Sequence, residues 1–485
     1  MLSHKKILYC ALLLLSCLSA KSQNKNSAVS ASAAMQWQDS SAKLHIKDIV
    51  VKGIRITKEY IILREIQFKK GDSLVIATIN KALEQARQQV YNTTLFTEVK
   101  LELADISAYD ATVIVTVRER WYIYPVPQFK PVDRNFNEWI KTYNASLKRV
   151  NYGLKFVDYN LTGRRDQLRL FFLTGFSRDF SFSYNAPYSN SKLTEGFVVG
   201  AGYSQKKEIA YKTTYTDSLL FYTSDSLRTK FVGSTFYVNA GYTIRRGFFN
   251  KHTFNASFYR LTVNDSIASP KYNPNYFGAG KTAVNILDLT YTFQYANVNN
   301  VLYATKGKTA FVGASKRGPG FTGGINALTL EAGYNKYYDL GKKWYSSIQL
   351  SSRLILPLRQ AYINQKGLGY GDSYLRGLEY LVIDGTATAL IKSTLKKKIV
   401  EFKVPLPFKI KSLPYIPFTF FAKTYADLGY EYNKKEFATN LNNRLLYTGG
   451  FGMDILTFYD INLRLEYSFN QLNQKGLFLH TQSGF

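Results

Sequence analysis

The chain has 485 residues, enough for several soluble domains or for one small domain followed by one large closed sheet. Apolar residues make up 46% and aromatic residues 15%, which excludes disorder over the whole chain because enough apolar surface exists to form a core. The net charge is +29, and the two cysteines, Cys10 and Cys17, both lie within the first twenty residues. The rest of the chain therefore cannot form a disulfide scaffold, a thiolate metal site or a cysteine nucleophile.

The first 22 residues are arranged like a secretion signal. Two lysines precede an apolar run from Ile7 to Leu18, and small residues follow at Ala20 and Ser22. The run is shorter than the roughly 20 residues that a helix needs to cross a bilayer. We therefore predict signal-peptide cleavage between Ser22 and Gln23.

A lipoprotein signal is the alternative, with Cys17 as the residue that carries the lipid. Leu15 is a poor residue for the position that precedes the small residue of such a site, so simple cleavage is favoured. A mature chain that begins at Gln23 has no cysteine, which suits an oxidising compartment. No other stretch approaches 18 uninterrupted apolar residues, so the sequence predicts no transmembrane helix.

Residues 45–120 predict a small mixed domain, preceded by a linker over residues 23–44 that is rich in Ser, Ala, Asn and Gln. Thr57 is expected to cap a short helix, and a turn around Gly71 is expected to provide a second cap. The predicted elements in chain order are a strand at 46–53, a helix at 57–64, a helix at 79–90, and strands at 95–103 and 111–119.

This order of elements predicts a three-stranded sheet covered by two helices, with one edge strand left open. An open edge can accept an extended peptide as an additional strand. A spacer domain that only packs against its neighbours is the alternative, and it is favoured on physical grounds alone.

From residue 121 to residue 485 the chain shows no sustained helical period and alternates apolar with polar residues. The apolar positions are rich in aromatic residues, as the two interfaces of a membrane require, and the opposite positions carry charge that a sandwich core would not tolerate. Backbone groups in lipid must all be paired, so an exported strand-rich membrane protein must close on itself. We predict a transmembrane antiparallel β-barrel of about 16 strands. The clearest alternating positions are Leu287, Leu289, Tyr291, Phe293 and Tyr295, and Ile461, Leu463, Leu465, Tyr467 and Phe469.

The positive charge is compatible with a nucleic-acid partner or with membrane lipid. The Lys and Arg residues are spread through turns and alternating positions, and they do not form a patch within a recognisable nucleic-acid-binding module. We therefore predict contact with anionic outer-membrane lipids and no nucleic-acid partner.

Two sets of residues carry a resemblance to a known family. In the small domain they are residues 49–53 (IVVKG), 71–72 (GD), 95–99 (LFTEV) and 117–120 (VRER). In the barrel the most specific segment is Leu375, Arg376, Gly377, Leu378, Glu379 and Tyr380. With these residues the small domain resembles a POTRA (polypeptide-transport-associated) domain, and the two regions together resemble the BamA/TamA-type outer-membrane proteins, in which POTRA domains precede a surface-antigen β-barrel.

In that family an Arg-Gly-aromatic segment lies on a long extracellular loop that folds back into the lumen. Here Leu378 stands in place of the aromatic residue, and Tyr380 follows two positions later. Further departures are the single POTRA unit, the segment 392–398 (KSTLKKK), and Thr481 and Ser483 in a last strand where apolar outward residues are common. These departures weaken the case for full insertase activity, though not for the fold.

The resemblance makes Arg376 the first candidate functional residue. A guanidinium buried in a barrel must be paired, and Asp427 and Asp454 are the acids expected to bind it and pin the loop; a solvated loop arginine is the alternative. Gly377 is expected to allow a backbone turn that a Cβ would block. Phe485, the aromatic terminal residue, is expected to be a signal to the cell's own barrel-assembly machinery or a lipid-facing last residue.

No enzyme chemistry is expected from the sequence. His45, His252 and His480 lie far apart without metal-binding spacing, and no convincing Ser/His pair accompanies them. No glycine-rich phosphate loop follows a strand and opens a helix. We therefore predict no catalytic residue, no cofactor and no metal.

The resemblance implies a protein of the outer membrane of a Gram-negative bacterium, with its POTRA domain in the periplasm. Such a protein would insert, assemble or translocate unfolded outer-membrane or exported client proteins, and periplasmic or lipoprotein subunits are candidate partners. A passive channel or structural barrel is the alternative. An assembly protein predicts few hydrogen bonds between the first and last barrel strands, and a passive pore predicts a full ladder.

Overall fold

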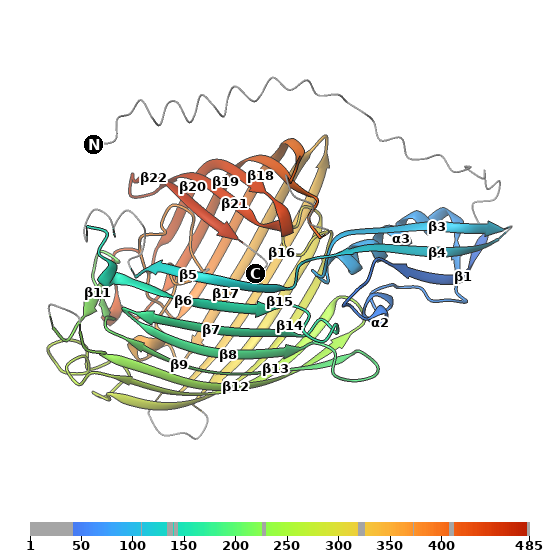
Figure 1. Cartoon of the computed structure of the whole chain (residues 1–485). Coiled ribbons are helices and arrows are strands. Elements are labelled where there is room, and N and C mark those ends of the chain that lie inside the picture. The colour runs from blue at the N-terminus through green and yellow to red at the C-terminus, as the bar shows by residue number, and fades with distance from the viewer. Residues whose placement is uncertain are drawn as a thin grey trace.

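The computed structural model describes residues 42–107, 109–132, 139, 144–225, 229–318, 325–371, 373–406 and 412–482. The predicted cleavage site at Ser22 and Gln23 and the terminal Phe485 lie outside the described residues. Figure 1 shows a small domain that projects from one end of a large curved sheet.

The small domain contains a four-stranded sheet and two helices (Figure 1). The strand order is β2-β1-β4-β3, and β1 and β4 are parallel while the other pairs are antiparallel. The sequence predicted three strands; the fourth, β2, forms because β1 begins at residue 43, before the predicted start at 46, and residues 43–45 pair with residues 73–75. The elements are β1 (Lys43–Lys52), α2 (Glu59–Leu63), β2 (Ser73–Val75), α3 (Ile76–Tyr91), β3 (Phe96–Ser107) and β4 (Asp110–Glu119).

The core of the small domain lies between one face of this sheet and α3. Alternate residues of β4, Val113, Val115 and Val117, are almost completely buried, as expected for a strand with one covered face. The predicted helical stripe of α3 is confirmed, because its apolar residues belong to the same core cluster. These α3 residues are Ile79, Leu83, Ala86 and Val90.

Thr57 does not cap a helix, contrary to the prediction. The helix α2 begins two residues later, with Lys58 at the N-cap position and no side-chain cap. The Thr57 hydroxyl lies 2.9 Å from the hydroxyl of Tyr122, and the Thr57 backbone N–H donates to Oε1 of Glu119 at 2.7 Å. The same Thr57 hydroxyl oxygen accepts from Nδ2 of Asn160 at 3.0 Å, so residues outside the helix occupy the oxygen that a local cap would need.

The large sheet has 16 strands, as predicted for a transmembrane antiparallel β-barrel. Each strand pairs antiparallel with its neighbour along the chain, and the short hairpin β10–β11 forms a separate two-stranded sheet between β9 and β12. The strands are β5 (Ile123–Pro131), β6 (Val150–Asp158), β7 (Gln167–Gly175), β8 (Arg178–Ala186), β9 (Glu195–Lys206), β10 (Ile209–Thr213), β11 (Leu219–Tyr222), β12 (Gly233–Arg246), β13 (Asn250–Val263), β14 (Ala283–Val298), β15 (Gly307–Arg317), β16 (Ala327–Gly341), β17 (Trp344–Leu356), β18 (Ala387–Pro405), β19 (Tyr415–Tyr432), β20 (Leu445–Leu456), β21 (Asn462–Asn470) and β22 (Lys475–Gln482).

Short 3-10 turns lie between strands at η2 (Leu147–Arg149), η3 (Tyr362–Asn364), η4 (Lys435–Phe437) and η5 (Phe458–Asp460). Within the part of the chain that the structure describes, no helix combines the length and the apolar character needed to cross a bilayer.

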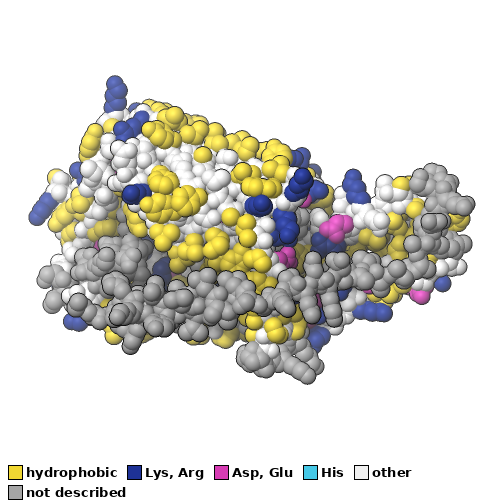
Figure 2. Space-filling model, turned by 90° about the horizontal axis from the view of Figure 1, so that it is seen from above, with side chains coloured by type: hydrophobic (Ala, Val, Ile, Leu, Met, Phe, Trp, Pro, Cys, Tyr) yellow, Lys and Arg dark blue, Asp and Glu magenta, His cyan; other side chains and the backbone are white. Residues whose placement is uncertain are grey.

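The wall of the barrel is apolar outside and polar inside. Leu289 and Leu463 are exposed on the outer face, whereas the residues that precede them, Asp288 and Asn462, are buried inside. Figure 2 shows hydrophobic side chains spread over much of the visible outer wall. This arrangement confirms the alternation predicted from the sequence, with one face for lipid and one for a polar lumen.

The small domain contacts the end of the barrel where several connections are short. Lys58 donates its backbone N–H to Gly163 in the β6–β7 connection, and Arg64 donates to Leu193 in the β8–β9 connection. The connection between β17 and β18, residues 357–386, belongs to the opposite end, because β17 runs away from the small domain and β18 returns toward it (Figure 1).

Candidate functional site: lumen loop, domain junction and barrel seam

Residues 357–386, here called the lumen loop, fold back into the barrel, as the family resemblance implied. Leu375 and Leu378 are 1% and 3% exposed. They pack in one apolar cluster with Leu390 of β18 and Leu446 of β20. The predicted motif therefore lies inside the barrel, against the wall formed by the late strands.

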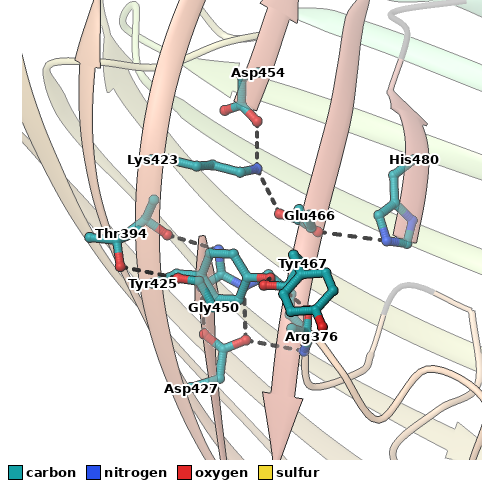
Figure 3. A network of polar contacts seen from close by, with 12 residues as sticks. Arg376, Thr394, Lys423, Tyr425, Asp427, Gly450, Asp454, Glu466, Tyr467 and His480 are labelled. Atoms are coloured by element: carbon teal, nitrogen blue, oxygen red, sulfur yellow. Dashed lines mark hydrogen bonds and ion pairs between the residues drawn. The ribbon is translucent and has the colours of Figure 1, made fainter. Parts of the chain in front are cut away.

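Arg376 forms a buried ion pair with Asp427 of β19, one of the two predicted partners (Figure 3). Its Nε donates to Oδ2 at 2.8 Å and its Nη2 donates to Oδ1 at 2.5 Å, so the contact is bidentate. Thr394 and the carbonyl oxygen of Ser393 accept the other guanidinium hydrogens at 3.0 and 3.1 Å. The guanidinium lies 4.0 Å from the ring centroid of Tyr425. Both charged groups are thus removed from water, and the guanidinium donors point at the carboxylate oxygens. In this geometry a buried ion pair holds its two partners in place.

Gly377 ties the lumen loop to β21. Its φ is +96°, a conformation that favours glycine, and a Cβ placed there would lie 2.8 Å from the Cβ of Ser468. Its carbonyl oxygen accepts from Nδ2 of Asn470 at 2.8 Å. Tyr380 does not take the buried place of the missing aromatic residue: it is 52% exposed and contacts Phe478 of β22, with 5.2 Å between ring centroids.

Asp454, the second acid predicted to bind Arg376, belongs to a different network. It accepts from Nζ of Lys423 at 2.5 Å and from the hydroxyl of Tyr303 at 2.8 Å. Lys423 also donates to Oε1 of Glu466 at 2.6 Å. One buried lysine therefore joins acids of β20 and β21, which is why Asp454 is not available to the arginine (Figure 3).

Next to this network, Glu379 of the lumen loop, Glu466 of β21 and His480 of β22 bring one oxygen or nitrogen ligand atom each within 4.8 Å of one another. His480 Nε2 lies 2.9 Å from Oε2 of Glu379 and 3.6 Å from Oε2 of Glu466. Imidazole nitrogens and carboxylate oxygens are common metal ligands. Among the described residues, this is the one group that brings three such ligand atoms close together.

At the junction of the small domain and the barrel, Glu65 is 1% exposed and binds Arg245 at the end of β12. The two Glu65 oxygens accept from Nη1 and Nη2 of Arg245 at 2.5 and 2.6 Å, and the hydroxyl of Tyr188 donates to the same carboxylate at 2.8 Å. Burial alone would raise the pKa of the Glu65 carboxyl, but Arg245 and Arg64 hold that pKa below its ordinary value.

A second junction contact centres on Asp460 of η5. Arg120, 7% exposed, donates from Nη2 to Oδ2 of Asp460 at 2.9 Å and from Nε to the carbonyl oxygen of Phe96 at 2.9 Å. Tyr91 of α3 and Asn300 of the β14–β15 connection donate to the same carboxylate at 3.0 and 2.9 Å. The acid therefore joins the small domain to two separate barrel connections.

Within the described residues, no strand pairing closes the sheet between its first and last strands. β5 and β22 stand at the two ends of the strand order, and no ladder pairs them within the described residues. Nor does any backbone hydrogen bond between described residues link 123–131 to 475–482. We call this boundary the seam.

The hydrogen bonds that β5 forms with β6 show which residues of β5 direct their backbone groups toward the seam. The N–H of Val132 donates to the carbonyl oxygen of Arg149, and the carbonyl oxygen of Tyr122 accepts from the N–H of Tyr159. Both bonds point toward β6 and come from even-numbered residues. Backbone N–H and C=O groups alternate in direction along an antiparallel strand. The N–H and C=O groups of the odd-numbered residues of β5 therefore point toward the seam.

Three of these odd-numbered residues are proline. Pro125, Pro127 and Pro131 have no N–H, so only Ile123 and Phe129 can offer a backbone donor to the seam. Within sheets, proline is found on edge strands, at the start of a strand or at bulges for this reason. The sequence of β5 itself thus keeps this edge from forming a full ladder.

The sequence interpretation missed both the junction pair and the seam edge. Glu65 and Arg245 are 180 residues apart, and no local pattern marks either residue as a partner of the other. The prolines were a readable signal, since two of them two positions apart in a strand indicate an edge that is not paired.

Comparisons with known proteins agree with the division of the chain into a small domain and a barrel. Residues 44–120 match the POTRA family, described as a surface antigen variable number repeat. The small domain is a POTRA domain. No curated protein matches the chain by sequence.

Solved structures match the chain over both regions. BamA from Haemophilus ducreyi, in a form lacking POTRA domains 1–3, aligns with a TM-score of 0.50 at 13% identity, covering 91% of this chain and 85% of that one. CdiB from Escherichia coli aligns with a TM-score of 0.52 at 12% identity, covering 90% of this chain and 75% of that one. The likeness is one of fold, and the chain has the BamA/TamA-type architecture, a POTRA domain followed by a 16-stranded barrel.

Proposed function

We propose that this protein inserts, assembles or translocates client proteins at the outer membrane of a Gram-negative bacterium, with its POTRA domain in the periplasm. The observation that carries the proposal is the seam. A passive pore needs a full ladder between its first and last strands, and the described residues of β5 and β22 share none. The fold of BamA and CdiB supports the same class of activity.

The seam can open at low cost because no backbone hydrogen bond between described residues holds it. A backbone hydrogen bond contributes about 0.5–1.5 kcal/mol net, and β5 offers only two N–H donors across the boundary. A client strand that enters meets the same shortage on β5. The free edge of β22 and the free edge of β3 in the POTRA domain are therefore the better surfaces for pairing with an extended client.

No covalent step or nucleotide is required by this proposal. Burial of the apolar strands of the client in lipid supplies the driving force. The lumen loop, held by Arg376 and Asp427, occupies space that an unobstructed channel would leave open. A passive channel or structural barrel is the competing function and is separated from the proposal by the experiments below.

The first experiment is depletion of the protein in its own host, followed by quantitative proteomics of the outer membrane. We expect a defined set of other barrels or surface proteins to decrease, and that set names the clients. An unchanged outer-membrane proteome, together with steady ion conductance of the purified protein, would favour the passive channel.

The second experiment restores donors to the seam with the double variant P125V/P127V. We expect a barrel that resists heat better on semi-native gels and a decrease of the same clients, because β5 can then pair with β22. The matched control is P417V, a proline of β19 at a position beyond the β19–β20 ladder, which should change neither property. A more heat-resistant barrel with undiminished clients would contradict the role of the seam.

A further inference from the structure

His480, Glu379 and Glu466 come from three separate segments and converge inside the barrel beside the seam. His480 lies on β22, the last strand, Glu466 on β21, and Glu379 follows the buried part of the lumen-loop motif. Figure 3 shows the His480 ring directed toward the Glu466 carboxylate. The ligand atoms of all three residues lie within 4.8 Å of one another.

Each of the three residues has one buried atom without a hydrogen-bond partner among the described residues: Nε2 of His480, Oε2 of Glu466 and Oε1 of Glu379. Nε2 of His480 lies at ion-pair distance, 2.9 Å, from the other Glu379 oxygen, Oε2. Glu466 is 0% exposed, and its other oxygen is taken by Lys423 at 2.6 Å. A buried polar atom without a partner costs free energy, so a fully buried carboxylate oxygen directed at an imidazole nitrogen indicates a missing ligand.

We propose that Glu379, Glu466 and His480 bind a divalent transition-metal cation of the Zn²⁺ class. An imidazole nitrogen and carboxylate oxygens are ligands that zinc accepts, at about 2.0–2.2 Å. Ligands around a tetrahedral ion are then about 3.4 Å apart, close to the 2.9 and 3.6 Å separations from Nε2. Small side-chain movements are enough to complete the coordination.

The surroundings orient the ligands in the way that metal sites require. Lys423 fixes the Glu466 carboxylate through its other oxygen, and Tyr374 stacks on the His480 ring at 5.7 Å between centroids with planes 23° apart. Such supporting contacts hold the ligands in place and tune their affinity. Three protein ligands leave one coordination position free for water.

The cation would join β22 to both β21 and the lumen loop. Among the described residues β22 pairs with β21 alone, so this cross-link acts on a strand with one unpaired edge. The proposal concerns cation binding and stands whether or not the protein handles clients. The proposal also differs from the expectation, drawn from the sequence, that the protein binds no metal. That expectation rested on the spacing of the histidines and did not include the two glutamates.

The test uses the full-length protein, folded in detergent and stripped of metal with a chelator. Zn²⁺ is titrated by calorimetry, and bound metal is counted by mass spectrometry after gel filtration. We expect about one Zn²⁺ per chain, and at least a tenfold weaker affinity in H480Q and in E379Q. The controls are H252Q on β13 and H45Q in the POTRA domain, which should bind Zn²⁺ like the unmodified chain.

Two outcomes would overturn the proposal: no stoichiometric Zn²⁺ in the stripped and reloaded protein, or equal affinity in H480Q and E379Q to that of the unmodified chain. E379Q lies on a loop and not in the sheet, so it keeps the test valid if H480Q fails to fold. A second readout is Co²⁺ absorption in the visible range, expected in the unmodified chain and lost in E379Q. Absence of that absorption in the unmodified chain would show that His480 and the glutamates form an ion pair only.

Discussion

At the domain junction, two buried carboxylates join the POTRA domain to the barrel, whereas at the seam no hydrogen bond among the described residues joins β5 to β22. The two regions are linked, because β5 follows directly from the end of the POTRA domain. The first strand of the barrel is therefore held in place by the junction. On the other side of the seam, Leu477 and Leu479 of β22 are each 68% exposed.

This difference shows where the fold concentrates its buried charge. Glu65, Asp460 and Asp427 are each bound by an arginine, and each pair fixes a separate part: two at the junction and one in the lumen loop. The seam has none of these contacts among the described residues, and it has prolines where donors would stand. Buried ion pairs thus hold the junction and the lumen loop, whereas no hydrogen bond between described residues closes the boundary between β5 and β22.

The largest effect is expected when the ion pair of the lumen loop is broken with R376A. The Asp427 carboxylate, 0% exposed, would be left unpaired, and loss of one partner of a buried pair costs about 3–5 kcal/mol. We expect lower barrel abundance and loss of heat resistance on semi-native gels. The matched control is R359A, in the same loop, whose ion pair with Glu436 is exposed and contributes about 0–1 kcal/mol. Unchanged mobility and abundance in R376A would refute the pinning role.

A smaller effect is expected when the junction is broken with E65Q. The neutral amide leaves the Arg245 guanidinium without a countercharge, at a cost of about 2–3 kcal/mol because that side chain retains some exposure. We expect a broader distribution of distances between POTRA domain and barrel, measured by electron paramagnetic resonance between spin labels at K100C and K342C. The exposed Glu59 provides the control E59Q. An equally narrow distribution in E65Q would show that Asp460 holds the junction alone.

A still smaller effect is expected from G377A. The positive φ of +96° disfavours a residue with a Cβ, and the added atom would lie 2.8 Å from the Cβ of Ser468. We expect a loss of about 1–2 kcal/mol, measured as the free energy of unfolding in urea from detergent. G371A is the control, because Gly371 also has a positive φ, +59°, but a Cβ added there would meet nothing within 4 Å, so the comparison isolates the contact with β21. Equal losses in the two variants would assign the whole effect to backbone strain.

The smallest effect is the response of the junction to acid. The pKa of Glu65 is held below its ordinary value of 4.5, so its contribution is present at neutral pH and is lost only as the pH falls through the lowered pKa. We expect the distance distribution of the unmodified chain to stay constant from about pH 8 to about pH 5 and to broaden below the ordinary carboxyl range. The E65Q variant should not show this acid transition. Broadening that begins above about pH 5 would contradict the assignment to Glu65.

Much of the fold was predictable because periodicity is a local property. The helical stripe of α3 and the alternation along β14 and β21 were read from spacing, and both are present in the structure. The fourth strand of the small domain was missed because β2 has three residues, too few to show a period. Thr57 was assigned a local cap because the partners of its hydroxyl, Tyr122 and Asn160, lie 65 and 103 residues away.

The candidate site divides in the same way. The Arg376 motif was found by resemblance, and one of its two predicted partners, Asp427, is the residue it contacts. The other, Asp454, could not be excluded from the sequence, since both acids come from inward-facing positions of neighbouring strands. Only the register of β19 and β20 places Lys423 within reach of Asp454.

The sequence by itself determined the division into a small mixed domain and a strand-rich region, the polar and apolar faces of the strands, and the missing donors of β5. These features depend on spacing and on residue type, which the chain carries wherever it folds. Only the tertiary structure decided which buried charges meet: Glu65 with Arg245, Arg376 with Asp427, and His480 with two glutamates. Such pairs form between distant segments, where strand register and the docking of one domain on the other bring the charged groups together.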